Sequence, residues 1–271
     1  MRYGIQRIAV ATNFTAEADH ALQYASILAK KYNAGLDIIH AVAPARLGKS
    51  GQVSAAYSKL KALREKVVIE HGIEAKVFSR MDGLTGFIYK YCVDNNTDLL
   101  LIGVQNHAKK YFGDSKSYEI IKKIECPVLS IPLSFNKADF GHILFPVRDV
   151  EGVEEKLLYS RPFMEKNRSE LHLINFGKQT NEALNEIFET AQNAGISVFV
   201  EDYSGDGSTK NISSKIISVA NEKGDDLIVI NATSEKDWYR VFGENYTEYI
   251  LKEADIPVLS ITHAFESAGI N

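Results

Sequence analysis

Long apolar runs and cysteines are scarce in this chain of 271 residues. No apolar run approaches the roughly 18 residues of a membrane-spanning helix, so we expect no transmembrane segment. The opening residues, MRYGIQRIAVATNF, hold only a short apolar stretch, which is more typical of a first strand than of a signal peptide. The only cysteines are Cys92 and Cys126, and we interpret both as small buried side chains outside any disulfide framework. These features favour a cytoplasmic protein.

Motifs of catalysis, metal binding and nucleic-acid binding are also missing. The chain has no G-x-S-x-G sequence and no H-E-x-x-H sequence. No second His or Cys is spaced to complete a metal site with His40 or His107, so structural or solvated roles are expected for both. No basic segment is interleaved with aromatic residues, which argues against nucleic-acid binding. We therefore expect a non-enzymatic protein without a metal.

Charge is present but unevenly shared between the two halves. Residues 1–135 hold 18 Lys and Arg against 12 Asp and Glu, whereas residues 136–271 hold 13 against 23. One interpretation is that the basic half binds an anion. Another is that the two halves attract each other across a common interface. Drift of solvated surface charge is the simpler alternative, and the sequence leaves all three open.

A duplication dominates the chain. The segment FGDSKSYEIIKKIECPVLSIP, residues 112–132, returns as FGENYTEYILKEADIPVLSIT at 242–262, and the two share the whole of PVLSI. Self-similarity at a fixed period indicates repeated structural units. We predict one domain at 1–133, a linker at 134–141 and a second domain at 142–271.

Short β-branched runs alternate with amphipathic segments in both halves. In the first half, strands and helices are expected in turn at 7–12, 16–33, 36–42, 51–71, 74–80, 84–95, 98–103, 115–124 and 127–132. In the second half, they are expected at 142–147, from there to about 166, and at 171–176, 181–193, 197–202, 211–222, 226–231, 246–253 and 257–262. Pro162 should kink its helix or end it early. The alternation predicts α/β domains with parallel sheets, doubly wound, with helices on both faces.

The chain resembles the universal stress protein family in a tandem arrangement. The resemblance rests on VATNFT and FPVRDV after the first strands, on TDLLLIG and DDLIVIN, and on CPVLSIP and IPVLSIT at the ends. It implies a five-stranded, Rossmann-like parallel sheet in each half and pairing of the two domains through their last strands. The chain would then form an internal pseudo-dimer, in which each half covers the edge strand of the other.

Nucleotide-binding members of this family carry an Asp after the first strand and G-x2-G-x9-G-[S/T] after the fourth. Glycines let backbone N–H groups close around phosphates, and a hydroxyl at a helix N-terminus adds a donor where the dipole favours anions. In the first half, the Asp position holds Asn13, and the first glycine is kept as Gly103. The second glycine is replaced by Asn106 and the third by Asp114. A displaced glycine and the hydroxyl remain as Gly113 and Ser115.

Lysines in the same loop are candidates to offset the carboxylate of Asp114. Lys109 and Lys110 lie there, although solvated loop lysines are the simpler interpretation. The positions that we assign to a nucleotide site in the first half, through the resemblance, are Thr12, Asn13, Val42, Gly103, Asn106, Lys109, Lys110, Gly113 and Ser115.

In the second half, the motif is replaced throughout. Arg148 holds the Asp position, and the four later positions are Asn231, Ser234, Glu244 and Asn245. We therefore expect no nucleotide there in the family's manner.

The preferred interpretation is a regulatory or protective stress-response module with a degenerate nucleotide-like pocket. It would recognise a protein partner or a small ligand, and neither nucleic acid nor a membrane. The alternative is a member that binds ATP or ADP weakly in the first domain, with slow hydrolysis left open. Pairing of two chains into a homodimer also stays open.

Overall fold

A computed structural model describes residues 4–43, 51–106, 116–137, 139–147, 152–177, 181–203, 209–232 and 246–262. Strands and helices alternate along them. The elements of the first half are β1 (Arg7–Ala11), α1 (Ala16–Tyr32), β2 (Gly35–Val42), α2 (Gly51–His71), β3 (Ala75–Met81), α3 (Leu84–Asp94), β4 (Leu99–Val104), α4 (Lys116–Lys123) and β5 (Val128–Pro132). Those of the second half are β6 (His142–Val147), α5 (Val153–Asn167), β7 (Glu170–Asn175), α6 (Asn181–Asn193), β8 (Val198–Asp202), α7 (Thr209–Lys223), β9 (Leu227–Ala232), α8 (Tyr246–Glu253) and β10 (Val258–Thr262).

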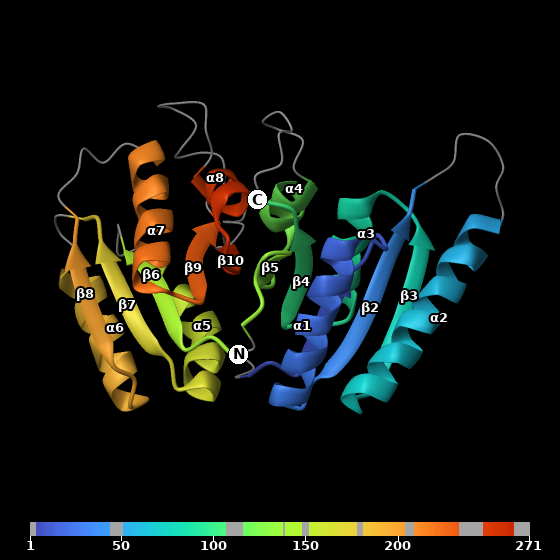
Figure 1. The fold of residues 1–271 in the computed structure, drawn as a ribbon, viewed down its shortest axis with the longest axis horizontal. Helices are drawn as coiled ribbons and strands as arrows, with labels where there is room; N and C mark the ends of the chain where they lie inside the picture. Colours follow the sequence, from blue (N-terminus) through green and yellow to red (C-terminus); the bar gives the residue numbers. More distant parts are fainter. Residues whose placement is uncertain are drawn as a thin grey trace, which may run out of the picture.

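The strands form one ten-stranded sheet that crosses the whole molecule (Figure 1). Its order is β3-β2-β1-β4-β5-β10-β9-β6-β7-β8. At the centre, β5 and β10 pair antiparallel, with Leu129 opposite Leu259. All other neighbours are parallel. Two doubly wound α/β domains joined through their last strands are therefore confirmed.

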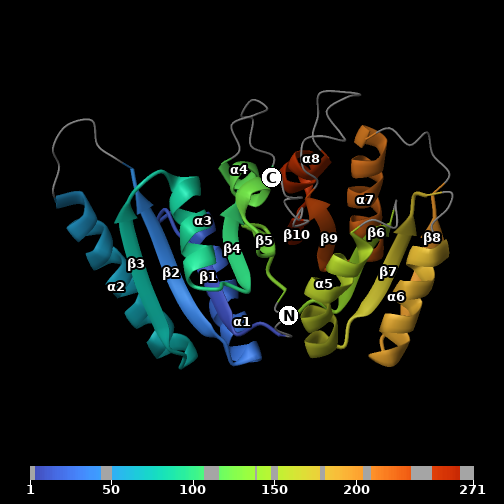
Figure 2. The same ribbon diagram turned by 180° about the vertical axis from the view of Figure 1, so that it is seen from behind.

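Helices cover both faces of the sheet. Buried residues of α1, α2, α5 and α6 form one apolar core, and those of α3, α4, α7 and α8 form the other. Figure 1 looks onto α1 and α2 in the first half, and α5 and α6 come forward when the molecule is turned (Figure 2). The strands at the centre read as continuous apolar runs because both of their faces are buried. No helix among the described residues is long and apolar enough to cross a membrane.

Hydrophobic periodicity located the elements closely: the predicted boundaries lie within two residues of the observed ones, except at the start of α5, which begins only at Val153. Of the two effects expected of Pro162, an early end is not seen, because helix α5 continues to Asn167, close to the predicted end at about 166. The ring of Pro162 removes a helical hydrogen bond. Phe163 and Met164, which follow it, are buried in the core, and this packing keeps the last turn helical.

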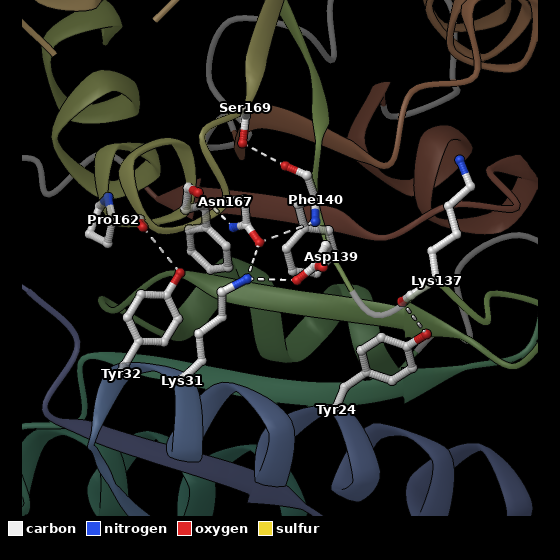
Figure 3. A network of polar contacts seen from close by, with 10 residues as sticks. Tyr24, Lys31, Tyr32, Lys137, Asp139, Phe140, Pro162, Asn167 and Ser169 are labelled. Atoms are coloured by element: carbon white, nitrogen blue, oxygen red, sulfur yellow. Dashed lines mark hydrogen bonds and ion pairs between the residues drawn. The ribbon is translucent and has the colours of Figure 1, made fainter. Parts of the chain in front are cut away.

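The linker runs along the contact between the two halves, which we call the seam. It is hydrogen-bonded to helices of both halves (Figure 3). From α1, the Tyr24 hydroxyl donates to the carbonyls of Phe135 at 3.1 Å and Lys137 at 2.8 Å. From α5, Asn167 accepts a hydrogen bond from the Phe140 backbone at 3.3 Å. These hydrogen bonds hold the linker against both α1 and α5, so the linker is part of the packed structure.

A second set of contacts joins α1 to α5 and the linker directly. Lys31 Nζ lies 2.7 Å from Asp139 Oδ1 and also donates to Asn167 Oδ1. The Tyr32 hydroxyl donates to the carbonyl of Pro162 at 3.2 Å (Figure 3). The carbonyl of Pro162 therefore takes part in the contact between the halves.

Candidate functional site

The candidate site of the first half lies where β2, β1 and β4 end side by side. Ala11, the last residue of β1, is in register with Ile39 on one side and Ile102 on the other. The chain leaves β1 for β2 on one side, and β4 lies on the other, so the strand order reverses here. Ligands of doubly wound folds bind at such a switch point. The structure thus brings together four of the sequence-predicted positions: Thr12, Asn13, Val42 and Gly103.

The turn after β1 is held by its own polar side chains. The Thr12 hydroxyl accepts the Phe14 N–H at 3.0 Å, and Phe14 has a φ of 61°, in the left-handed region. Asn13 Oδ1 accepts the Thr15 hydroxyl at 2.8 Å and the Thr15 N–H at 3.3 Å. The exposed Asn13 amide is thus drawn toward the N-terminus of α1. It carries no charge where the family's nucleotide-binding members have a carboxylate.

The rings of Phe14 and His40 flank this turn, and neither residue belongs to the nucleotide-binding motif. The His40 ring lies 4.5 Å from the Phe14 ring, and His40 Nδ1 lies 2.7 Å from the Thr12 carbonyl oxygen. Lys59 of α2 places its Nζ 5.2 Å from the centre of the Phe14 ring. The role of His40 here is structural. Nothing in the sequence links Lys59 to Phe14, because only the packing of α2 joins them.

Gly103 is required by helix packing. A Cβ at this position would overlap the backbone carbonyl of Glu17 in the first turn of α1. The missing side chain therefore lets α1 begin directly against β4. The glycine has a structural reason to be present, whether or not a phosphate binds nearby.

One further predicted position, Asn106, is engaged elsewhere, and Val42 of the switch-point group is itself buried. Asn106 donates its amide to the carbonyl of Ala254, between α8 and β10 of the second half. Val42 is buried, and its carbonyl accepts the Asp82 N–H at 3.1 Å. The remaining positions, Lys109, Lys110, Gly113 and Ser115, lie outside the described residues.

The second half reverses the arrangement at Gly103. The equivalent of Gly103 is Asn231 near the end of β9, and its amide donates to the Gly152 carbonyl at 3.1 Å. Gly152 is the N-cap of α5 with a φ of 75°, and a Cβ there would overlap the Asn231 amide. In one half, a glycine on the strand accommodates the helix backbone. In the other, a glycine before the helix accommodates a side chain on the strand.

A buried lysine lies beneath this second site. Lys156 of α5 is 4% exposed, donates to the Pro146 carbonyl at 2.5 Å, and lies 4.0 Å from the centre of the Phe145 ring. Burial lowers the pKa of Lys156 to about 7. The sequence signal for this buried lysine is its helical spacing, because Lys156 shares the apolar stripe of Val153 and Leu157.

The strand order 3-2-1-4-5 in each half, joined at the fifth strands, defines a two-domain protein of the doubly wound α/β class. Residues 4–132 match the universal stress protein family. The matched residues make up the first of the two domains. None of the curated proteins compared matches the chain.

Solved structures share the two-domain fold over nearly the whole chain. A universal stress protein from Archaeoglobus fulgidus DSM 4304 is 18% identical, with a TM-score of 0.76, over 94% of this chain and 98% of that one. A protein of unknown function from Pseudomonas aeruginosa PAO1 is 18% identical, with a TM-score of 0.62, over 95% and 92%. At this identity, the likeness establishes the fold alone.

Proposed function

We propose that this protein is a non-enzymatic stress-response module whose nucleotide-like pockets have lost their original chemistry. The observation that carries this proposal is the side chain of Asn231, which lies against Gly152 and donates to its carbonyl. In the family's motif, this position is a glycine, whose lack of a side chain leaves the backbone open to a phosphate. In the second half, the Asn231 side chain thus occupies space that a glycine would leave open.

The state of the first pocket supports the same proposal. Asn13 supplies an amide that is already engaged with Thr15, and Asn106 is engaged with Ala254. Gly103 is accounted for by the packing of α1. We infer that such a module acts by presenting its surface and pockets to a protein partner or a small ligand.

A second candidate function is weak binding of ATP or ADP in the first half. The specific observation in its favour is that Thr12, Asn13, Val42 and Gly103 do meet at the switch point of the sheet. Lys109, Lys110, Gly113 and Ser115 would then supply the phosphate contacts.

Calorimetric titration of ATP and ADP into the full chain, with and without magnesium, separates the two candidates. We expect no binding in the micromolar range. The matched variants are Asn13→Asp, which restores the family's carboxylate, and Ser115→Ala, which removes the remaining hydroxyl. Micromolar binding of one nucleotide per chain that Ser115→Ala abolishes would establish the second candidate and end the first.

A further inference from the structure

A large cavity lies between the halves, away from the switch point. Its volume is about 1180 Å³. On one side, it is bounded by segments that precede β1, β4 and β5, so it opens at the amino ends of these strands. On the other side, it is bounded by α5. Its walls include Ile5, Cys92, Cys126, Leu158, Tyr159 and Pro162.

Both cysteines of the chain line this cavity and contact each other. Cys92 lies in the last turn of α3 and is 6% exposed, and the partly buried Cys126 precedes β5. Two backbone hydrogen bonds hold their segments together: Thr97 N–H donates to the Cys92 carbonyl, and Leu100 N–H donates to the Pro127 carbonyl, both at 3.0 Å. The thiols are close enough for a hydrogen bond between them. The pairing was not expected from the sequence, where both cysteines were interpreted as inert.

The two thiols differ in acidity. The hydrogen bond from Cys126 lowers the pKa of Cys92 despite the opposing effect of burial, and the nearby Thr97 hydroxyl lowers it further. The same hydrogen bond to Cys92 and burial raise the pKa of Cys126. This difference favours Cys92 as the attacking thiol and Cys126 as the hydrogen-bond donor.

We propose that Cys92 and Cys126 form a redox-active dithiol, which a low-molecular-weight disulfide entering the interdomain cavity oxidises to an intramolecular disulfide. The cavity is large enough to hold such a molecule beside the thiols. This inference does not depend on nucleotide binding, because the dithiol lies at the opposite end of the strands from the switch point.

The chemistry is a pair of thiol–disulfide exchanges. The Cys92 thiolate attacks one sulfur of the small disulfide, forming a mixed disulfide and releasing one small thiolate. Cys126 then loses its proton, and its thiolate attacks Cys92 Sγ, which displaces the second small thiolate. Both small thiolates take up the protons that the cysteines lost. The protein is oxidised by two electrons, and the small disulfide is reduced to two thiols.

Glutathione disulfide is a suitable probe for the folded full-length chain. After acid quenching, the remaining thiols are alkylated, and intact mass and non-reduced peptide maps are recorded. We expect both thiols to disappear without retained glutathione, a Cys92–Cys126 linked peptide pair, and recovery with dithiothreitol. Thiols that stay fully alkylatable, disulfides only between chains, or glutathione retained on both cysteines would each overturn the proposal.

Serine variants test the order of the steps. Cys126→Ser should stop at the mixed disulfide and retain one glutathione on Cys92. Cys92→Ser should react more slowly, because burial still raises the pKa of the remaining Cys126 thiol. Equal rates for the two variants would contradict the assignment of Cys92 as nucleophile. If circular dichroism shows that a variant does not fold, the peptide map of the wild-type chain decides the proposal alone.

Discussion

Single side chains set the chemistry of each half, and Lys156 of α5 has a direct consequence for stability. Its ammonium lies against the Phe145 ring and the Pro146 carbonyl, and no ion pair with a carboxylate is found for it among the described residues. A buried charge without a counter-ion destabilises the folded state, which explains the lowered pKa. Among the buried residues of α5, Lys156 is the only charged one.

Replacing Lys156 with Met should stabilise the protein in a pH-dependent way. The folded pKa is about 7, below the ordinary 10.5, so the unfolded chain binds the extra proton between these values. The penalty is complete below pH 7 and fades as pH rises toward 10.5. Lys156→Met should raise the free energy of unfolding by about 2–4 kcal/mol at pH 6, and by much less at pH 10. Urea unfolding at both pH values measures this.

The matched control is Lys90→Met on the exposed face of α3. Its effect should be within about 0.5 kcal/mol and independent of pH. A Lys156→Met gain that is the same at pH 6 and pH 10 would contradict the assignment of a buried charge.

At the scale of elements, the contact between the first helix and the fourth strand of each domain depends on one glycine. Gly103 allows the first turn of α1 to lie on β4, and Gly152 allows Asn231 of β9 to reach the N-cap of α5. The duplicated halves therefore solve the same packing problem in opposite ways. This exchange cannot be recognised from either sequence half alone, because it involves residues far apart in the chain.

Gly103→Ala should be strongly destabilising. The new methyl group would overlap the backbone of Glu17, which cannot rotate away as a side chain could. We expect a loss of about 3 kcal/mol or more in the free energy of unfolding. Gly86→Ala, in α3 with open space around it, is the control and should stabilise by about 0.5–1 kcal/mol. Equal effects of the two variants in urea unfolding would show that the contact with α1 can relax.

For the whole molecule, the seam joins the two domains into one unit. The central pair β5 and β10 continues the hydrogen bonding of the sheet, and one apolar core extends through both halves. The linker adds Phe140, whose ring lies 5.7 Å from Phe163 of α5 and 6.3 Å from Phe135. Lys31 and Asp139 add an ion pair at the same seam, in line with attraction between the basic half and the acidic half.

Phe140→Ala should destabilise both domains together. Phe140 is 1% exposed, and removing a buried phenyl ring costs about 3–5 kcal/mol. Because the residue lies in the shared core, calorimetry should show a single transition at a lower temperature. Phe199→Ala on β8, where the ring is 58% exposed, is the control and should have little effect. Two separated transitions in the wild-type chain would show that the seam does not couple the domains.

The amino-acid sequence by itself determined the order of strands and helices, because each element's apolar period is a local property. The alternation of these elements predicted the doubly wound class, the duplication predicted two domains, and the resemblance to a known family implied the pairing of the PVLSI strands. Only the tertiary structure showed that α5 continues past Pro162 to Asn167, that Gly103 accommodates α1, that Asn231 is hydrogen-bonded to Gly152 and that Cys92 and Cys126 line one cavity. These relations join residues distant in sequence, and they exist only once helices pack on the sheet.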